Sequence, residues 1–492
     1  MKNVLTKSKD HNPNYLATIC KIGPLSPIEG ADRLKTAVVN GHTIVVSCDQ
    51  KPTDTVVYFP CESALAEKYL SANNLFEIGC ADRNSNFENV ERLVKEAEKA
   101  KDANDLDRYK EFSDSAKALC GYFGKNRRVR ILKLRGVYSD GFIADAETLR
   151  KAYPKELAGV NFDDYIDEQF DTVGEERVCE KFIPKLPNQN TGQRNPWGRR
   201  MKILRQFDRI NTDYFKFHYD TKMLVEHIKE IDPEKNVIVS VKVHGKSVVL
   251  ANVLCNRKLT IFDKVKKFFG VKVPTLEYEN VYSSKKVIRN RYINPKGEDT
   301  GDYNIWKDVN RVFAPYLEKG MTVYGEVVGY EAGSSTFLQE GHDYGCKPGQ
   351  WKFMPYRITT CEGEGGELFE WNLQDVDLWT RKLVHNHPEL AENVLFLTIL
   401  YHGPLKDMYP DLNVAEHFHA NIIEKMKNDK DRLGMELDEP LCIHKVPREG
   451  IVVRIDDDDA PFPRAWKLKT MRHYDLAKKN ADKGVIDTED IS

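Results

Sequence analysis

The sequence predicts an α+β protein with two domains, and three patterns carry that prediction. The first 75 residues contain short β-branched runs, such as HTIVVSCD and DTVVYFP, separated by Gly, Pro, Asn and Asp, which is typical of a small barrel or sandwich. Residues 85–120 are rich in Glu, Lys and Ala, which predicts a helical insertion. Beyond residue 195, strand-like and helical stretches alternate, as expected of antiparallel sheets with helices.

The boundary between the domains is predicted from composition. Residues 185–198, KLPNQNTGQRNPWG, concentrate Pro, Gly, Asn and Gln, which is the composition of a linker. We therefore expect a β-rich module over residues 1–190 and a second domain over residues 195–492. A chain of 492 residues is long enough for two such cores.

The overall composition excludes some classes of protein. No window holds 18 uninterrupted apolar residues and the first residues lack an apolar signal-like core, so we expect neither export nor membrane insertion. The 10 scattered cysteines include no CxxC pair, so we expect a protein of the cytoplasm, or of the host cytoplasm if it is viral. The net charge of -2 argues against a nucleic-acid partner, but this sum averages over local clusters. Three basic clusters stand out: Arg127–Arg135; Arg194, Arg199, Arg200, Lys202 and Arg205; and Lys264, Lys266, Lys267 and Lys272.

The segment SVKVHGKS, residues 240–247, allows two interpretations. It resembles a phosphate-binding loop, but Ser240 stands where that motif begins with glycine, and the β-branched run VVLANVL follows in place of a helix. The alternative is a strand that ends at Lys242 and turns tightly through Gly245 into the next strand. A lysine amine held at such a place can attack phosphorus, although a solvated turn would contain the same residues.

Charged residues in three later apolar strands favour the second interpretation. Glu326 lies in YGEVVG and Glu449 begins EGIVVR, while Lys467 and Lys469 lie two residues apart in AWKLK. Side chains two residues apart on a strand share one face. Two carboxylates can hold a hydrated divalent cation and two lysines can grip a phosphate. Together with Lys242, these residues predict a site for nucleotidyl transfer.

The order of these motifs resembles that of the covalent nucleotidyltransferase superfamily, the ATP-dependent polynucleotide ligases and mRNA capping enzymes. Lys242 matches the lysine that becomes adenylated, Glu326 and Glu449 match the carboxylates of motifs III and IV, and Lys467 and Lys469 match the motif V pair. The resemblance implies that these five residues are catalytic and bind ATP. It also implies that Glu326 and Glu449 hold Mg²⁺ or Mn²⁺ through water.

Further cofactor contacts are implied by the same resemblance. The segment KFMPYRIT resembles the motif whose aromatic residue stacks on the nucleobase, a role assigned to Tyr356 with Phe353 as the alternative. In motif I, His244 stands where many members have Asp, and Gly245 completes the turn. The arginine that contacts the ribose has no clear match, so Lys285, Lys286 and Arg289 all stay open, with Lys285 as the first choice.

Domain order indicates the branch of the superfamily. DNA ligases and capping enzymes carry an OB barrel after motif V, but only 23 residues follow Lys469 here. The chain instead resembles RNA ligases with an N-terminal OB module. We expect an OB-like β-barrel with a helical insertion, followed by an ATP-grasp-like nucleotidyltransferase domain. The residues of the OB-like module that we expect to contact RNA are Arg128, Arg130, Lys133 and Arg135.

The resemblance implies a function in three chemical steps. ATP adenylates Lys242, AMP then moves to an RNA 5′-phosphate, and a 3′-hydroxyl attacks that activated end and expels AMP. The expected partner is RNA with 5′-phosphate and 3′-hydroxyl ends, possibly as a nicked duplex, and we expect a monomer. A DNA or mixed RNA/DNA strand ligase with the same covalent chemistry stays open as the alternative.

Overall fold

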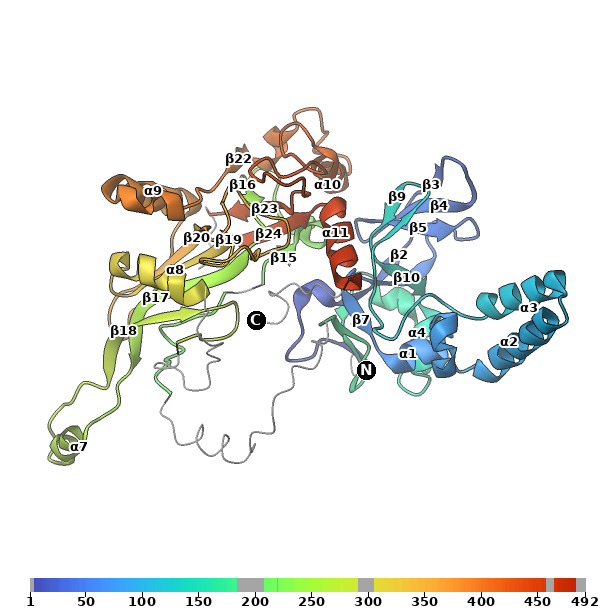
Figure 1. The fold of residues 1–492 in the computed structure, drawn as a ribbon, viewed down its shortest axis with the longest axis horizontal. Helices are drawn as coiled ribbons and strands as arrows, with labels where there is room; N and C mark the ends of the chain where they lie inside the picture. Colours follow the sequence, from blue (N-terminus) through green and yellow to red (C-terminus); the bar gives the residue numbers. More distant parts are fainter. Residues whose placement is uncertain (1–3, 184–207, 219, 291–304, 457–463, 484–492) are drawn as a thin grey trace. The chain divides into compact units, whose positions relative to one another are not determined.

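The computed structural model describes residues 4–183, 208–218, 220–290, 305–456 and 464–483 (Figure 1). The chain divides into two compact units, Met1–Ile183 and Pro184–Ser492. The proposed linker at 185–198 and the basic cluster from Arg194 to Arg205 lie outside the described residues. None of the helices in the described part combines the length and the apolar character needed to cross a bilayer.

The N-terminal unit consists mainly of short strands. They are β1 Leu5–Thr6, β2 Ala17–Lys21, β3 Leu25–Ile28, β4 Ala31–Val39, β5 His42–Ser47, β6 Thr55–Phe59, β7 Ser63–Leu65, β8 Leu132–Leu134, β9 Val137–Ser139, β10 Phe142–Asp145, β11 Gln169–Phe170, β12 Thr172–Val173, β13 Glu176–Arg177 and β14 Cys179–Lys181. The helices are α1 Glu67–Ala72, α2 Phe87–Asp102, α3 Leu106–Ala118 and α4 Glu147–Ala152, with short 3-10 turns η1 Pro13–Tyr15, η2 Ile78–Arg83 and η3 Phe162–Tyr165.

These strands do not form the closed barrel that the sequence predicts. The described strands pair as one four-stranded sheet in the order β10-β6-β2-β11, two three-stranded sheets, β3-β4-β5 and β1-β12-β13, and two pairs. Closure needs every strand to be hydrogen-bonded on both edges. Here the ladders are only a few residues long and the helical insertion separates β7 from β8, so the sheet is divided into separate pieces.

The charged stretch between β7 and β8 is helical, as its composition predicts. Helices α2 and α3 pack against each other through Val90 and Ala116, which are both buried. Asp105 begins α3 by accepting a hydrogen bond from the Arg108 backbone N–H, and such a cap satisfies one of the free donors at a helix start.

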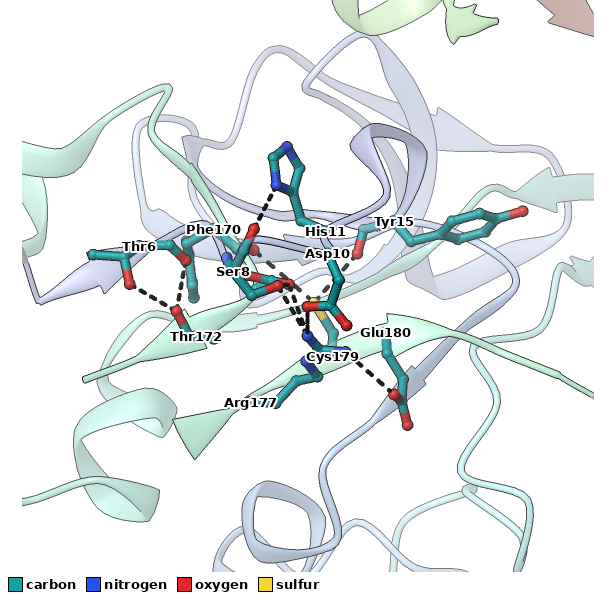
Figure 2. Close-up of polar contacts among 11 residues, drawn as sticks. Thr6, Ser8, Asp10, His11, Tyr15, Phe170, Thr172, Arg177, Cys179 and Glu180 are labelled. Atoms are coloured by element: carbon teal, nitrogen blue, oxygen red, sulfur yellow. Dashed lines mark hydrogen bonds and ion pairs between the residues drawn. The ribbon is translucent and has the colours of Figure 1, made fainter. Parts of the chain in front are cut away.

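Residues 8–10, near the start of the chain, are hydrogen-bonded to residues 171–177, near the end of the first unit. Figure 2 shows Arg177 directed at Asp10 and Ser8, and the Arg177 Nη2–Ser8 Oγ distance is 2.9 Å. Asp171 accepts a 2.7 Å hydrogen bond from the Ser8 backbone N–H. Residues that are more than 160 positions apart therefore close the unit, which makes residues 5–181 one folded body.

The second unit contains longer strands. They are β15 Lys222–Met223, β16 Asn236–Lys242, β17 Lys246–Asn256, β18 Leu276–Ser283, β19 Met321–Gly329, β20 Trp351–Cys361, β21 Leu368–Glu370, β22 Ile399–Pro404, β23 Gly450–Ile455 and β24 Arg464–Lys469. The helices are α6 Leu224–His227, α7 Ile261–Phe268, α8 Ile305–Phe313, α9 Leu373–Asn386, α10 Phe418–Asn428 and α11 Met471–Asp482, with 3-10 turns η4 Ile228–Glu230, η5 Ala314–Tyr316, η6 Pro388–Asn393 and η7 Leu405–Met408.

Two five-stranded sheets form the centre of this unit. The first sheet has the order β15-β24-β23-β16-β22 and the second has the order β18-β17-β19-β20-β21. Strand β16 belongs to the first and β17 to the second, so the turn at residues 243–245 connects the two sheets. Since β17 is a strand of 11 residues, the phosphate-loop interpretation of SVKVHGKS, which needs a helix there, is wrong.

Each sheet is covered by helices on its outer face, and the two sheets share an apolar layer. Helices α6 and α10 pack on the first sheet in one buried core, while α8 and α9 pack on the second in another. Between the sheets, Val241 and Val243 of the connecting region contact Val328 and Met354 of the second sheet. This layer holds the connecting turn in place.

The β17–β18 hairpin extends beyond the sheet and carries α7 at its tip (Figure 1). Helix α7 begins with a capping box between Thr260 and Asp263. Its lysines are exposed, and so are Phe262 and Phe268. Three lysines of the third basic cluster, Lys264, Lys266 and Lys267, therefore belong to an exposed helix at the tip of the hairpin, and Lys272 follows that helix.

Candidate active site

Lys242 is the last residue of β16, and it lies beside the start of β23 and the end of β24. Gly450 pairs with Lys242 on one side and with Lys469 on the other. In β24, Trp466 and Leu468 pack into the core of the first sheet. Because side chains alternate along a strand, Lys467 and Lys469 both face away from that core, as the sequence predicts.

Glu449, immediately before β23, connects this set of charges. Its Oε2 atom lies 2.9 Å from Lys242 Nζ and its Oε1 atom lies 2.7 Å from Lys469 Nζ. The carboxylate is 2% exposed. Burial raises the pKa of Glu449, but Lys242 and Lys469 outweigh this and hold the pKa well below its usual range. The site thus contains a buried, ionised carboxylate between two half-buried lysines.

Glycine at position 245 is required by the close approach of the two sheets. A Cβ atom there would lie 2.6 Å from the Val327 carbonyl oxygen and 2.9 Å from Val328 Cγ1. Val327 is in the middle of β19 and cannot move without breaking the ladder. Gly245 therefore lets the turn rest directly on the second sheet.

The turn is also held by hydrogen bonds from a distant loop. The Tyr344 hydroxyl accepts a 2.6 Å hydrogen bond from the His244 backbone N–H, and Gln339 donates through Nε2 to the Gly245 carbonyl at 2.9 Å. Asp343, which is fully buried, accepts hydrogen bonds from backbone N–H groups of Gly345, Ile443 and His444. This loop fixes the backbone that follows Lys242.

A second group of charges lies around Lys467. Burial and the nearby positive charges of Lys469, Lys285 and Lys242 lower the pKa of Lys467 to about 7. Lys285, which follows β18, forms an ion pair with Asp220. Burial raises the pKa of Asp220, but Lys285 outweighs it and the pKa falls to about 2. Because its pKa is about 7, Lys467 carries less than a full positive charge at neutral pH until an anion binds.

The three candidates for the ribose contact, Lys285, Lys286 and Arg289, differ in their surroundings. Arg289 is buried, and its guanidinium carbon lies 4.3 Å from the centre of the Trp306 ring. Lys286 is exposed. Lys285 is half-buried and belongs to the charged group around Lys467, so it is the best placed of the three.

The aromatic candidates also differ in position. Phe353 is fully buried and packs 5.2 Å from Phe313 in the core beneath the second sheet, which leaves no face for a base. Tyr356 is half-buried, and its ring lies 5.5 Å from that of His218. Burial lowers the pKa of His218 to about 3, so this imidazole is neutral. Tyr356 is therefore the only one of the two with surface available.

Glu326 comes to the site from the second sheet. It lies in the centre of β19, opposite Ser247 of β17 and Met354 of β20, and is 9% exposed. It shares a strand face with Tyr324 and Val328 because these residues are two positions away on either side. Val328 belongs to the layer between the sheets, so this carboxylate faces the first sheet.

The basic strand of the N-terminal unit is less uniform than the sequence suggests. Arg128 is 3% exposed and forms a two-pronged ion pair with Glu62, so it does not fit the predicted role in RNA contact. Arg130 donates to the Tyr122 carbonyl. Lys133 is exposed on β8, whereas Arg135 is exposed in the β8–β9 turn.

The fold brings three further residues to this site, and the sequence assigns none of them a role. His473 on α11 lies 3.8 Å from Glu449 through Nε2, Tyr344 holds the turn, and Asp220 pairs with Lys285. Asp220 lies in FHYDT and Tyr344 lies in GHDYGC. Both segments resemble those of the RNA ligases with an N-terminal OB module, and this resemblance is the signal that points to them. For His473, which stands in an ordinary helical stretch, there was none.

Comparison with solved structures identifies the fold. A Naegleria gruberi RNA ligase variant with AMP and Mn matches at a TM-score of 0.51 and 18% identity, covering 94% of this chain and 99% of that chain. A second variant of that ligase, with ATP and Mn, matches at a TM-score of 0.52 and 16% identity, covering 94% and 100%. The chain has the fold of an RNA ligase.

The RNA-ligase fold extends over both units, because the matches cover nearly the whole of each chain. It confirms, at the level of fold, the resemblance that the sequence motifs predict. No protein-family model matches the sequence, and no curated protein is significantly similar to it.

Proposed function

We propose that the protein is an ATP-dependent RNA ligase that joins 3′-hydroxyl and 5′-phosphate ends. The observation that carries the proposal is the placement of Lys242 beside Glu449 and Lys469 in one strand register. The matched structures are RNA ligases solved with AMP or ATP and Mn, which supports the same chemistry here.

The first proposed step is attack by the Lys242 amine on the α-phosphorus of ATP. The new nitrogen–phosphorus bond replaces the bond to pyrophosphate, which leaves, and the amine loses a proton. Lys467 and Lys469 would neutralise phosphate charge, and Lys467 is suited to this because binding of an anion would favour its protonated form. Tyr356 would stack on the adenine and Lys285 would contact the ribose.

A divalent cation would neutralise the charge that develops during this transfer. Glu449 fits this role because it is buried and ionised, and Glu326 offers a second carboxylate from the other sheet. In the next two steps AMP passes to an RNA 5′-phosphate, and a 3′-hydroxyl then displaces it as the phosphodiester forms.

We further propose that the N-terminal unit, residues 1–190, is an OB-like module that binds the RNA, with the transferase at 195–492. The exposed Lys133 and Arg135 support this, because phosphate contacts come from accessible cations. Replacing both with Ala should weaken RNA binding and reduce its salt dependence. If the double variant binds RNA with the same affinity and salt dependence as the wild type, Lys133 and Arg135 do not contact the RNA.

The deciding experiment measures covalent adduct formation. Incubation with α-labelled ATP and Mg²⁺ or Mn²⁺ should label the protein, and Lys242→Ala should abolish the label. Lys229→Ala is the matched control, since that lysine is exposed in the same unit. If the wild-type protein forms no adduct with either metal, the proposed function is wrong.

The nature of the nucleic acid is tested by sealing. Nicked duplexes with either RNA or DNA at the 3′-hydroxyl end, together with single-stranded and hairpin RNA, would be offered to the adenylated protein. An RNA ligase seals the RNA-ended substrates preferentially. Equal sealing of DNA ends would favour the alternative, a DNA or mixed-strand ligase that uses the same lysine chemistry.

A further inference from the structure

Three metal-ligating side chains converge next to Lys242. His244, Glu449 and His473 each offer one donor atom, and these atoms all lie within 4.8 Å of one another. His244 Nδ1 is 3.7 Å from one oxygen of Glu449, and His473 Nε2 is 3.8 Å from the other. The two imidazole rings meet edge to face, with their centres 4.8 Å apart. The three donors therefore form one compact cluster.

The backbone fixes two of these donors relative to each other through Thr470. The Thr470 backbone N–H donates to the Glu449 carbonyl at 2.9 Å. Its hydroxyl donates to the Arg448 carbonyl at 2.7 Å and accepts from the His473 backbone N–H at 3.2 Å, as the cap of α11. The carboxylate and the imidazole are thus presented by one rigid corner, while Tyr344 holds the backbone of His244.

His473 is enclosed by the fold beside Glu449. It is 3% exposed, and its Nδ1 atom is buried without a hydrogen-bond partner among the described residues. Imidazole is a common metal ligand through either ring nitrogen. By contrast, both ring nitrogens of His342 lie near backbone carbonyls, at 2.9 and 3.4 Å.

We propose that His244, Glu449 and His473 bind a transition-metal ion directly. Two imidazoles and one carboxylate form a donor set that suits Zn²⁺, Co²⁺, Mn²⁺ or Fe²⁺, whereas Mg²⁺ prefers oxygen ligands and water. Donor atoms around such an ion lie about 3 Å apart. The three donor atoms now lie within 4.8 Å of one another, so side-chain rotations would have to bring them closer together around the ion.

The metal and Lys242 would share one carboxylate. Glu449 Oε2 is 2.9 Å from Lys242 Nζ. A cation bound to Glu449 would compete with Lys242 for this oxygen and weaken the ion pair. The relevance of this competition to catalysis rests on the proposed function, but binding of the metal itself does not.

Binding is tested on the full chain without nucleotide, by titration with Co²⁺ and observation of its visible absorption. We expect one site, with Co²⁺ and Zn²⁺ competing and Mg²⁺ failing to displace them. Because outer-shell changes alone weaken metal sites about 10–100-fold, His473→Ala and His244→Ala should each weaken binding at least about tenfold. His385→Ala, at an exposed helical histidine, is the matched control.

His473→Gln supplies a second variant with nearly the same volume, and urea unfolding checks that each variant is folded. The proposal is overturned if Co²⁺ shows no ligand-field absorption, or if folded variants at positions 244 and 473 bind as tightly as the wild type. If the protein forms an adduct with ATP but fails these tests, the proposed metal site is wrong and the proposed ligase function is retained. If the protein binds Co²⁺ as expected but forms no adduct, the proposed function is wrong and the metal site is retained.

Discussion

Removing the Lys467 amine should stabilise the protein while impairing its activity. Lys467→Met keeps the apolar stem and removes a charge that the fold opposes. A pKa of about 7 in place of the usual 10.5 means that the folded protein disfavours the charged amine by at most about 5 kcal/mol. Since the side chain is half-buried and solvent screens part of this, we expect a gain of about 2 kcal/mol in the free energy of unfolding near neutral pH.

The gain in the free energy of unfolding of Lys467→Met should be largest at low pH and should fall as the pH rises. Well below pH 7 the unfavourable charge is present in full, because the lysine is protonated in both the folded and the unfolded chain. Between the folded pKa of about 7 and the unfolded value of 10.5 the folded amine is neutral, and the penalty shrinks as the pH rises. The advantage of the variant should therefore fall to about a third by pH 9.5.

Urea unfolding followed by tryptophan fluorescence measures this effect in the correct unit. All 6 tryptophans lie at or beyond position 197, so the signal reports the second unit alone. Lys229→Met, at an exposed lysine, should change stability little. The reasoning would be refuted by a Lys467→Met variant that is no more stable than the wild type at pH 6.5, or whose gain is the same at pH 9.5.

Three further variants test other contacts. Gly245→Ala places a Cβ atom 2.6 Å from the Val327 carbonyl; adduct formation should fall about 100-fold, because displacing a catalytic group by about 1 Å has that effect, and an unchanged rate would contradict the packing argument. Tyr344→Phe removes the acceptor of the turn and should destabilise the second unit by about 1–2 kcal/mol in the same urea assay; a neutral change would dismiss this hydrogen bond. Arg128→Ala removes two hydrogen bonds to Glu62 and should lower the thermal midpoint measured by circular dichroism, with a free-energy loss of about 1–3 kcal/mol. RNA affinity per folded molecule should stay unchanged, and a selective loss of affinity would restore the RNA role.

The strands and the main charged residues could be predicted because their signals are local. A run such as GIVVRI is β-branched and apolar enough to form β23 in most contexts, and the i,i+2 spacing of Lys467 and Lys469 places both on one face without further information. The helical insertion is predicted equally well, since α2 and α3 follow from composition.

Prediction fails where long-range contacts decide. An arginine among arginines looks like a phosphate contact, but Arg128 is buried because Glu62, 66 residues away, pairs with it. A short strand carries no signal for closure, so the expected barrel could not be distinguished from the separate sheets that form. Local sequence says nothing of either outcome, because both depend on which distant segment packs against the residue.

The sequence by itself determined the kind of chemistry: a strand-end lysine, two carboxylates and a lysine pair in the order that nucleotidyl transfer requires. Only the tertiary structure decided the electrostatic surroundings of these groups. Glu449 lies between Lys242 and Lys469, and His473 reaches it from α11, because β16, β23 and β24 are adjacent strands of one sheet. Charges act through space rather than along the chain, so their pKa values and their metal preference depend on that sheet order.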